Sequence, residues 1–369
     1  MQRSLSAFLL LLFLAAGLLT ACEKTTTEPG TPTGPDRTAL LTYWADSLVL
    51  PGYQQFGDKL APLKAQATAF AAAPTVAGLQ TLRAAWREAY LAWQPVEMFE
   101  FGPAADVSLV NRFNIYPADA PGIRQNIAAG SYNFELSTTI AQQGFPALDF
   151  LLNGVAADDA AIVQSYLASA GQRRYLTDVV NDMDRLFGGV QAQWRGPYRA
   201  KFVGSTGTNA GSSFSLLVNA FSRYYEHYLR SGKIGIPAGV MTGTPAPDKV
   251  EARYAGGALS LQLATTAHAA VQRNFNGRAG QPSLKNYLDA LGAKDSGSGK
   301  QLSELISAQL AVAAQQLAGL GPDLATTVQT RNAAATQAFA DMQKAVRLLK
   351  VDMTSAMSVT VTYVDNDGD

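Results

Sequence analysis

The feature of the sequence that most constrains its fold is a set of apolar side chains that recur every three or four residues. The clearest instance starts after Thr75, which suits the N-cap of a helix, and its apolar positions are Leu79, Leu82, Trp86, Tyr90 and Trp93. This spacing returns to one face of an α-helix, so it predicts an amphipathic helix with a buried stripe. Glu97 is the next position on that stripe. Its carboxylate is therefore expected to point inward at the end of the helix.

The same period recurs through most of the chain and predicts an all-α fold. Helix is expected in well over half of the residues, against a base rate of about one third. Proline and glycine separate the predicted helices, as at Pro51, Gly171, Gly232 and the pair Gly321–Pro322. The predicted helices cover residues 38–50, 53–72, 158–169, 172–195, 212–230, 257–275, 283–292, 298–319 and 323–357.

A stretch rich in Gly, Ser and Thr at residues 204–213 is the best internal boundary. It predicts an N-terminal bundle at residues 37–203 and a C-terminal bundle at residues 204–369, each resembling a four-helix bundle. Residues 102–156 follow no regular period, as expected for a functional segment or a crossover. Val359–Tyr363 alternates like a short strand and predicts a short extended tail.

The N-terminus reads as an export signal. Arg3 precedes an apolar run from Ala7 to Leu19, which is shorter than the roughly 20 residues that cross a bilayer. The run ends in Leu-Thr-Ala-Cys, a lipobox whose cysteine, Cys22, is the only one in the chain. Residues 1–22 are therefore predicted to be a lipoprotein signal with Cys22 lipidated, and residues 23–36, rich in Thr, Pro and Gly, a flexible tether. The alternative is an ordinary cleaved signal with a chance cysteine.

These features predict an extracytoplasmic protein that meets the membrane through its lipid, on the outer membrane rather than the inner one. Lys plus Arg and Asp plus Glu each number 29, so no basic excess supports nucleic-acid binding. The two histidines, His227 and His268, form no H-E-x-x-H pair for zinc. We interpret both as packed side chains, with a metal or haem ligand as the alternative for His227.

Four motifs resemble the imelysin family, also called peptidase family M75. Gly144, Phe145, Pro146 and Asp149 occupy a G-x-H-x-x-E motif that is followed by an aromatic residue and leucines. Trp86-Arg87, Glu97 and Phe101-Gly102-Pro103 look like a W-R…E…F-G-P segment, Lys233, Gly235 and Pro237 like a K-I-G-x-P element, and the chain ends in a similar D-G-D. The resemblance covers nearly the whole chain after the tether.

The resemblance implies two four-helix bundles related by a pseudo-repeat, with a cleft between them. It also implies an extracytoplasmic protein linked to iron uptake. Some family members have been called insulin-cleaving proteases, but the family lacks a convincing peptidase centre. The motif histidine is Pro146 here, which offers no ligand atom, and the motif glutamate is the shorter Asp149.

Glu97 and Asp149 together are the predicted metal site. Two carboxylates form a hard, oxygen-rich site that suits Fe³⁺, Mn²⁺ or Ca²⁺ better than zinc. Residues 144–152 are expected to line the cleft near Glu97. In the alternative interpretation Glu97 is solvated or paired with Arg87 or Arg112, and Asp149 is an acid in the first turn of a helix opened by Pro146.

Three functions remain open from the sequence. The first is a non-catalytic binding lipoprotein that serves iron or haem acquisition, with iron, haem or an uptake-system protein as its partner and no catalytic residue. The second is a metallopeptidase, as the family's other name implies. The third is an interaction or scaffold lipoprotein whose ancestral site has decayed. Carboxylates that converge in the cleft would favour the first, and an apolar filled cleft would favour the third.

Overall fold

The computed structural model describes residues 34–364. The all-α prediction is confirmed, because residues 34–364 contain helices and no strand, apart from one isolated bridge between Lys294 and Gln301. No helix in this range is long and apolar enough to cross a membrane. The lipobox with Cys22 and the D-G-D ending lie outside the described residues.

The first long helix runs through a predicted break. Helix α2 (Arg37–Tyr43), π-helix η1 (Trp44–Val49) and helix α3 (Leu50–Ala72) follow one another without interruption. The sequence predicts a break between helices at Pro51, and this prediction is wrong. At the end of η1 the N–H of Leu50 donates to the carbonyl of Ala45, five residues back. This wider π turn directly precedes Pro51, which has no N–H to donate, and the helix continues through it.

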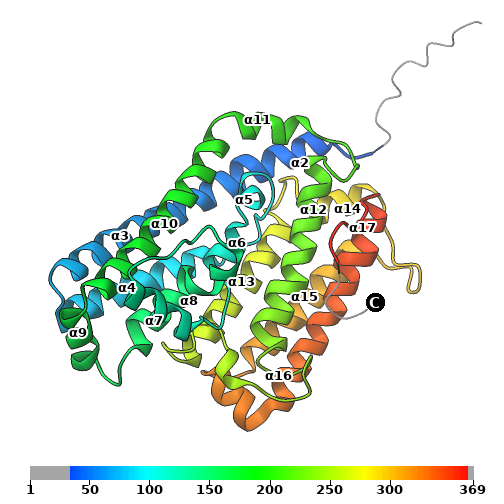
Figure 1. Cartoon of the computed structure of the whole chain (residues 1–369). Coiled ribbons are helices and arrows are strands. Elements are labelled where there is room, and N and C mark those ends of the chain that lie inside the picture. The colour runs from blue at the N-terminus through cyan, green and yellow to red at the C-terminus, as the bar shows by residue number, and fades with distance from the viewer. Residues whose placement is uncertain (1–33, 365–369) are drawn as a thin grey trace, which may run out of the picture. The chain divides into compact units, whose positions relative to one another are not determined.

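Helix α4 (Val76–Trp93) begins where the sequence predicts, since the Thr75 side chain accepts a hydrogen bond from the N–H of Gly78. Helices α4 and α10 (Ala170–Arg195) both pack against α3, and Figure 1 shows the three side by side. Phe56 of α3 lies at their centre, with ring centroids 4.7 Å from Phe187 and 5.3 Å from Trp93. The predicted apolar stripe of α4 is thus a core face.

Residues 102–156 are mostly helical, although they show no helical period. Their helices hold only 4 to 10 residues each, too few for a repeating apolar stripe to develop. The elements are α5 (Pro103–Asp106), α6 (Leu109–Phe113), α7 (Ala120–Ala129), the 3₁₀-helix η2 (Ser137–Gln142), α8 (Gly144–Asp149) and the π-helix η3 (Phe150–Gly154). Helix α9 (Asp159–Ala168) then leads into α10.

The predicted boundary at residues 204–213 falls between α11 (Pro197–Gly204) and α12 (Ser213–Arg223). The two-bundle division and the pseudo-repeat stay predictions. Beyond the boundary, α13, α15, α16 and the π-helix η4 pack together (Figure 1). The remaining elements are η4 (Tyr224–Gly235), η5 (Pro247–Lys249), α13 (Gly257–Asn276), α14 (Leu284–Ala290), α15 (Leu302–Ala318), α16 (Leu324–Arg347), η6 (Leu348–Met353) and α17 (Thr354–Ala356).

Two details of the C-terminal part differ from the sequence pattern. The single helix predicted for residues 323–357 is kinked at Arg331, whose φ of −141° and ψ of 43° are not helical. The alternating segment Val359–Tyr363 pairs with no strand in the described residues. Instead, the Asn219 side chain donates to the carbonyl of Thr360 at 3.0 Å and accepts from the N–H of Thr362 at 2.9 Å. The Asn219 side chain thus binds backbone groups that a neighbouring strand would bind in a sheet.

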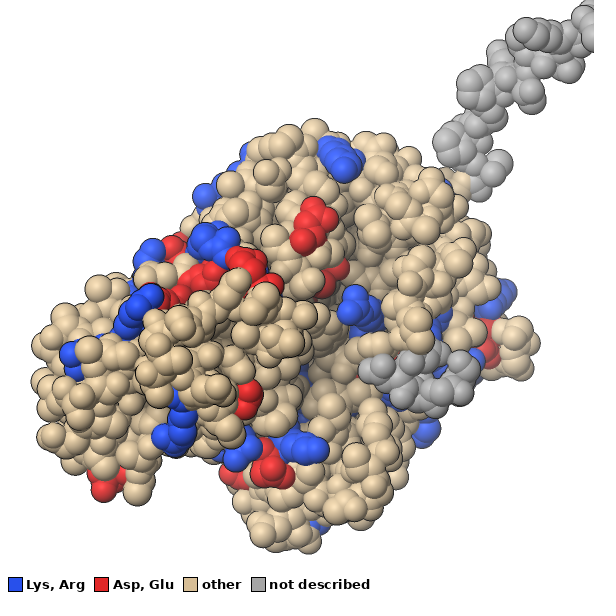
Figure 2. Space-filling model, in the orientation of Figure 1, with Lys and Arg blue, Asp and Glu red and all other residues tan. Residues whose placement is uncertain are grey.

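Charged side chains of both signs are intermixed on the face shown in Figure 2. In one network Arg112 lies 2.6 Å from Glu135 and 2.9 Å from Asp182, and Arg185 lies 2.7 and 2.5 Å from the same two carboxylates. Such pairs neutralise one another locally.

Candidate functional site

The π-helix η4 places Tyr224, Tyr228 and Lys233 on one face. A π-helix takes about 4.4 residues per turn because each N–H bonds five residues back, so steps of four and five residues return to the same side. An α-helix with 3.6 residues per turn would put Lys233 opposite Tyr224. In the structure the Tyr224 hydroxyl donates to Glu97 Oε2 at 3.0 Å, and Lys233 Nζ lies 3.4 Å from the same oxygen.

These contacts belong to a buried charge cluster. Lys233 Nζ also donates to both carboxylate oxygens of Glu251, at 2.9 and 2.8 Å. Glu97, Lys233 and Glu251 are each at most 1% exposed. Burial alone would lower the pKa of Lys233, but the carboxylates of Glu251 and Glu97 outweigh it and hold that pKa above its ordinary value. Two carboxylates therefore share one ammonium group away from bulk water.

Asn114 joins the two carboxylates from a second side. Its Nδ2 donates to Glu97 Oε1 at 2.6 Å and to Glu251 Oε1 at 2.7 Å. Its Oδ1 accepts a hydrogen bond from the hydroxyl of Tyr90 on α4. Glu97, Asn114, Tyr224, Lys233 and Glu251 together are called the Glu97 cluster below. Burial, reinforced by the nearby carboxylates, raises the pKa of Tyr90 and Tyr224 well above the ordinary value, so both phenols remain donors.

A pocket of about 240 Å³ opens over this cluster. Glu97 and Lys233 lie at the pocket, and its wall includes Tyr116 and His227. Burial lowers the pKa of His227, and its Nε2 has no hydrogen-bond partner among the described residues. Its ring packs against that of Tyr363, at 5.5 Å between centroids, which agrees with the packed-aromatic interpretation. The pocket, called the Glu97 pocket below, is lined by Glu97, Asn114, Ile115, Tyr116, His227, Tyr228, Gly232, Lys233 and Ile236.

Asp149 lies at the end of helix α8 and is buried. It is the last residue of α8, so the expectation of a first-turn acid is wrong. Its carboxylate accepts hydrogen bonds from the backbone N–H of Tyr254 at 2.8 Å and from Asn153 Nδ2 at 3.1 Å. Burial raises the pKa of Asp149 to about 7. Tyr254 follows Glu251 in one loop, in which Ala252 has a φ of +53°, so Asp149 holds the loop that carries Glu251.

Glu97 and Asp149 share no hydrogen-bond partner in the described residues. The carboxylate that shares partners with Glu97 is Glu251, which no motif and no period singles out. Among the described residues, no group of three or more His, Cys, Asp or Glu side chains is placed to hold a metal ion. The metal-binding roles of Glu97 and Asp149 stay predictions.

The other residues of the G-x-H-x-x-E-like motif are packed into the core. Gly144 has a φ of +72°, and a Cβ there would lie 2.3 Å from the carbonyl oxygen of Phe113. Phe145 stacks on the ring of Tyr90 at 4.4 Å, and its carbonyl accepts from Trp86 Nε1 at 3.2 Å. Pro146 is buried in α8. The motif therefore reaches the Glu97 cluster through Tyr90 and does not line the Glu97 pocket.

The remaining predicted residues also have structural partners. Arg87 donates to Gln262 at 2.7 Å, and Arg112 binds Glu135 and Asp182, so neither pairs with Glu97 as the alternative expected. A Cβ on Gly235 would lie 2.6 Å from the Phe339 ring. The carbonyl of Pro237 accepts from the N–H of Ala246 at 2.8 Å. His268 is buried, with Nε2 2.8 Å from the carbonyl oxygen of Leu310, as expected for a core histidine.

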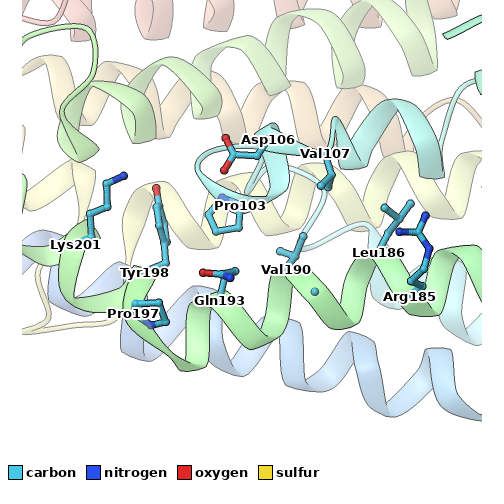
Figure 3. Close-up of a pocket in the computed structure, with 11 residues that line it drawn as sticks. Pro103, Asp106, Val107, Arg185, Leu186, Val190, Gln193, Pro197, Tyr198 and Lys201 are labelled. Atoms are coloured by element: carbon cyan, nitrogen blue, oxygen red, sulfur yellow. The ribbon is translucent and has the colours of Figure 1, made fainter. Parts of the chain in front are cut away.

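A larger groove of about 670 Å³ lies along α5, α10 and α11 (Figure 3). Its floor includes Leu186 and Val190, and the cationic Arg185 and Lys201 stand near its two ends. Arg185 is exposed and already paired with two carboxylates. Buried charges with specific partners beside a pocket are typical of functional sites. The smaller Glu97 pocket is therefore the stronger candidate site.

Comparisons with known proteins agree with the motifs. The family model described as Imelysin matches residues 49–353. Iron-regulated protein A of Synechococcus elongatus is 26% identical over 152 residues, which span 41% of this chain and 39% of that protein. The match thus covers well under half of that relative's length.

Two crystal structures share the fold. An imelysin-like protein from Psychrobacter arcticum 273-4 has a TM-score of 0.68 at 20% identity, over 89% of this chain and 97% of that one. A protein described as an iron-regulated protein A precursor, from Parabacteroides distasonis, has a TM-score of 0.69 at 18% identity, over 88% and 97% of the two chains. With the family model covering most of its length, the chain belongs to the imelysin family.

Proposed function

We propose that the protein is a non-catalytic, lipid-anchored extracytoplasmic binding protein that serves iron acquisition, with the Glu97 pocket as its ligand site. The observation that carries this proposal is the convergence of two buried carboxylates, Glu97 and Glu251, on one ammonium group at the pocket. Converging carboxylates are the arrangement that distinguishes a binding site from an apolar, filled cleft.

Two further observations support the biological setting. The lipobox ending at Cys22 supports export and lipid anchoring, and we place the anchor on the outer membrane. The name of the relative from Synechococcus elongatus, Iron-regulated protein A, supports a link to iron. An uptake-system protein would be the natural partner for a binding protein held at the membrane.

The size of the pocket and its donor atoms favour a small, hard ligand over haem. A volume of about 240 Å³ is below the range of about 300–1,000 Å³ that encloses drug-sized molecules, so a whole haem would not be enclosed. The pocket is lined by the carboxylate of Glu97, the phenols of Tyr116 and Tyr228 and the amide of Asn114. The adjoining cluster adds the carboxylate of Glu251 and the phenol of Tyr224. Oxygen donors of this kind suit a ferric ion or a compact ferric complex.

Titration of the soluble body, from residue 23 onward, with ferric nitrilotriacetate and separately with haemin tests the proposal. We expect saturable ferric binding that weakens at least about tenfold, or 1.4 kcal/mol, in Glu97→Gln. Glu88→Gln is the matched control, because Glu88 is 59% exposed in a surface pair with Lys59. Absence of ferric binding would refute the proposal. Chelator-sensitive cleavage of casein by the same protein would instead support the metallopeptidase alternative.

A further inference from the structure

The ammonium group of Lys233 fills the space between the two carboxylates of the Glu97 cluster. Its nitrogen lies 2.8 and 2.9 Å from the oxygens of Glu251 and 3.4 Å from Oε2 of Glu97. The side chain is 1% exposed. A metal ion bound by both carboxylates would sit among the same oxygens at about 2.0–2.6 Å. The ammonium and such an ion cannot occupy this space together.

The two carboxylates of the cluster carry more negative charge than the single ammonium group neutralises. Glu97 and Glu251 bring two negative charges, while Lys233 brings one positive charge. A multivalent ion in the position of the ammonium would therefore interact more favourably with the two carboxylates than the ammonium does, provided that the ion can enter. The attraction to the two carboxylates rises with ionic charge, so it is largest for a ferric ion, which must also give up the most strongly bound water to enter.

The Glu97 pocket provides space into which the Lys233 side chain can move. Lys233 itself lines the Glu97 pocket, next to Gly232, and the volume beyond it is about 240 Å³. A lysine carries its charge on a flexible four-carbon stem, so rotation about that stem would move the ammonium away from the carboxylates and into the pocket.

We infer that Lys233 is a specificity-determining residue that acts as an internal competitor, so that a cation enters the Glu97 cluster only in exchange for its ammonium group. The inference deepens the proposed function, since it concerns the same pocket and rests on a cation being its ligand. Weakly competing divalent ions are kept out by Lys233, whereas a ferric ion displaces it.

The test is Lys233→Met, which keeps most of the stem and removes the charge. Two buried carboxylates then face each other, so the variant should melt below wild type in EDTA. Mn²⁺ alone should restore much of that loss and should bind at least about tenfold more tightly than it binds wild type. In the double variant Lys233→Met/Glu97→Gln, which keeps one carboxylate, both gains should disappear.

Two controls separate this effect from general stabilisation by Mn²⁺. Leu310→Ala removes a fully buried apolar side chain and lowers the melting temperature without changing the charge, so Mn²⁺ should not rescue it. Lys233→Arg keeps a positive charge between the carboxylates and should show no gain in Mn²⁺ affinity. If Lys233→Met does not fold in EDTA, Lys233→Gln provides the neutral variant for the same titration.

The outcomes distinguish this inference from the proposed function. Equal Mn²⁺ affinities of folded Lys233→Met and wild type would overturn the inference, even if wild type binds ferric iron. A gain in Mn²⁺ affinity without ferric binding by wild type would uphold the exclusion of divalent ions by Lys233 and overturn both the ferric exchange and the proposed function. A gain that persists in the double variant would place the new Mn²⁺ site outside the cluster and overturn the inference.

Discussion

Tyr224 and Lys233 lie nine positions apart in the chain, yet both reach the same oxygen of Glu97, the hydroxyl at 3.0 Å and the ammonium nitrogen at 3.4 Å. The π-helix between them makes this possible, because its wider turn brings positions four and five apart onto one face. π-Helical turns occur often at functional sites. Here one of them builds the face of the Glu97 pocket that contains Lys233.

The two carboxylates of the cluster should differ in their effect on stability. Glu251 contacts Lys233 with both oxygens, while Glu97 does so with one, at a longer distance. We expect Glu251→Gln to lower the free energy of unfolding by about 3 kcal/mol or more, and Glu97→Gln by about 1–2 kcal/mol. Urea denaturation of the three proteins measures this difference. Equal losses, or a larger loss for Glu97→Gln, would contradict the unequal pairing.

Stability should fall as the pH rises from about 4 to about 8. Burial raises the pKa of Asp149 from 3.8 to about 7 and the pKa of Glu100 from 4.5 to about 8. Over this range the folded protein keeps protons that the unfolded chain has released, so raising the pH lowers the free energy of unfolding. We expect a loss of about 1 kcal/mol or more between pH 5 and pH 8. Urea midpoints across this range provide the measurement.

Asp149→Asn serves as the control for that pH dependence. It should flatten the part of the curve that lies below about pH 7, because an amide does not titrate and its oxygen still accepts from the N–H of Tyr254. Unchanged slopes in this variant would show that Asp149 ionises normally in the folded protein.

Asp149→Asn should also separate the motif acid from the ligand site. Since Asp149 binds the backbone of Tyr254 and shares no partner with Glu97 in the described residues, ferric affinity should stay within a factor of about three, or 0.65 kcal/mol. Glu97→Gln should weaken ferric binding at least about tenfold in the same titration. Comparable losses of ferric affinity from both variants would support the metal site predicted from Glu97 and Asp149.

Gly144 should tolerate no side chain. Gly144→Ala would place Cβ 2.3 Å from the carbonyl oxygen of Phe113, at a φ of +72°. We expect a loss of more than about 3 kcal/mol, of which the left-handed backbone accounts for roughly 1–2 kcal/mol. Gly130→Ala is the matched control, because Gly130 has a φ of +67° and nothing within 4 Å of its Cβ position. Chemical denaturation of both variants should show the larger loss at Gly144.

Lipidation of Cys22 should decide where the protein is found. We expect Cys22→Ser to move the protein from the membrane fraction to the soluble fraction, because stable anchoring requires acyl chains on that residue. Mass spectrometry of the wild-type N-terminus should show an acylated Cys22 as the first residue. An unmodified N-terminus elsewhere, or a membrane-bound Cys22→Ser protein, would contradict the lipobox assignment.

Helices with a long apolar stripe can be predicted from local spacing, because burial of one face imposes the period. Thr75 caps α4 as predicted, and the apolar stripe of α4 packs into the core. Pro51 shows where local rules fail, since a π turn before it lets the helix continue. The short helices between residues 102 and 156 also escape prediction, because none is long enough to repeat a pattern.

The sequence by itself determined the all-α class, the family motifs and the inward position of Glu97. Only the tertiary structure decided which groups Glu97 contacts. Glu251 lies in a loop that follows no period. Lys233 reaches Glu97 because η4 is a π-helix, whereas a period of 3.6 residues would predict Lys233 on the opposite face. A buried carboxylate is stable only where packing brings its ammonium and amide partners to it. Contacts of that kind join distant parts of the chain, so no local spacing encodes them.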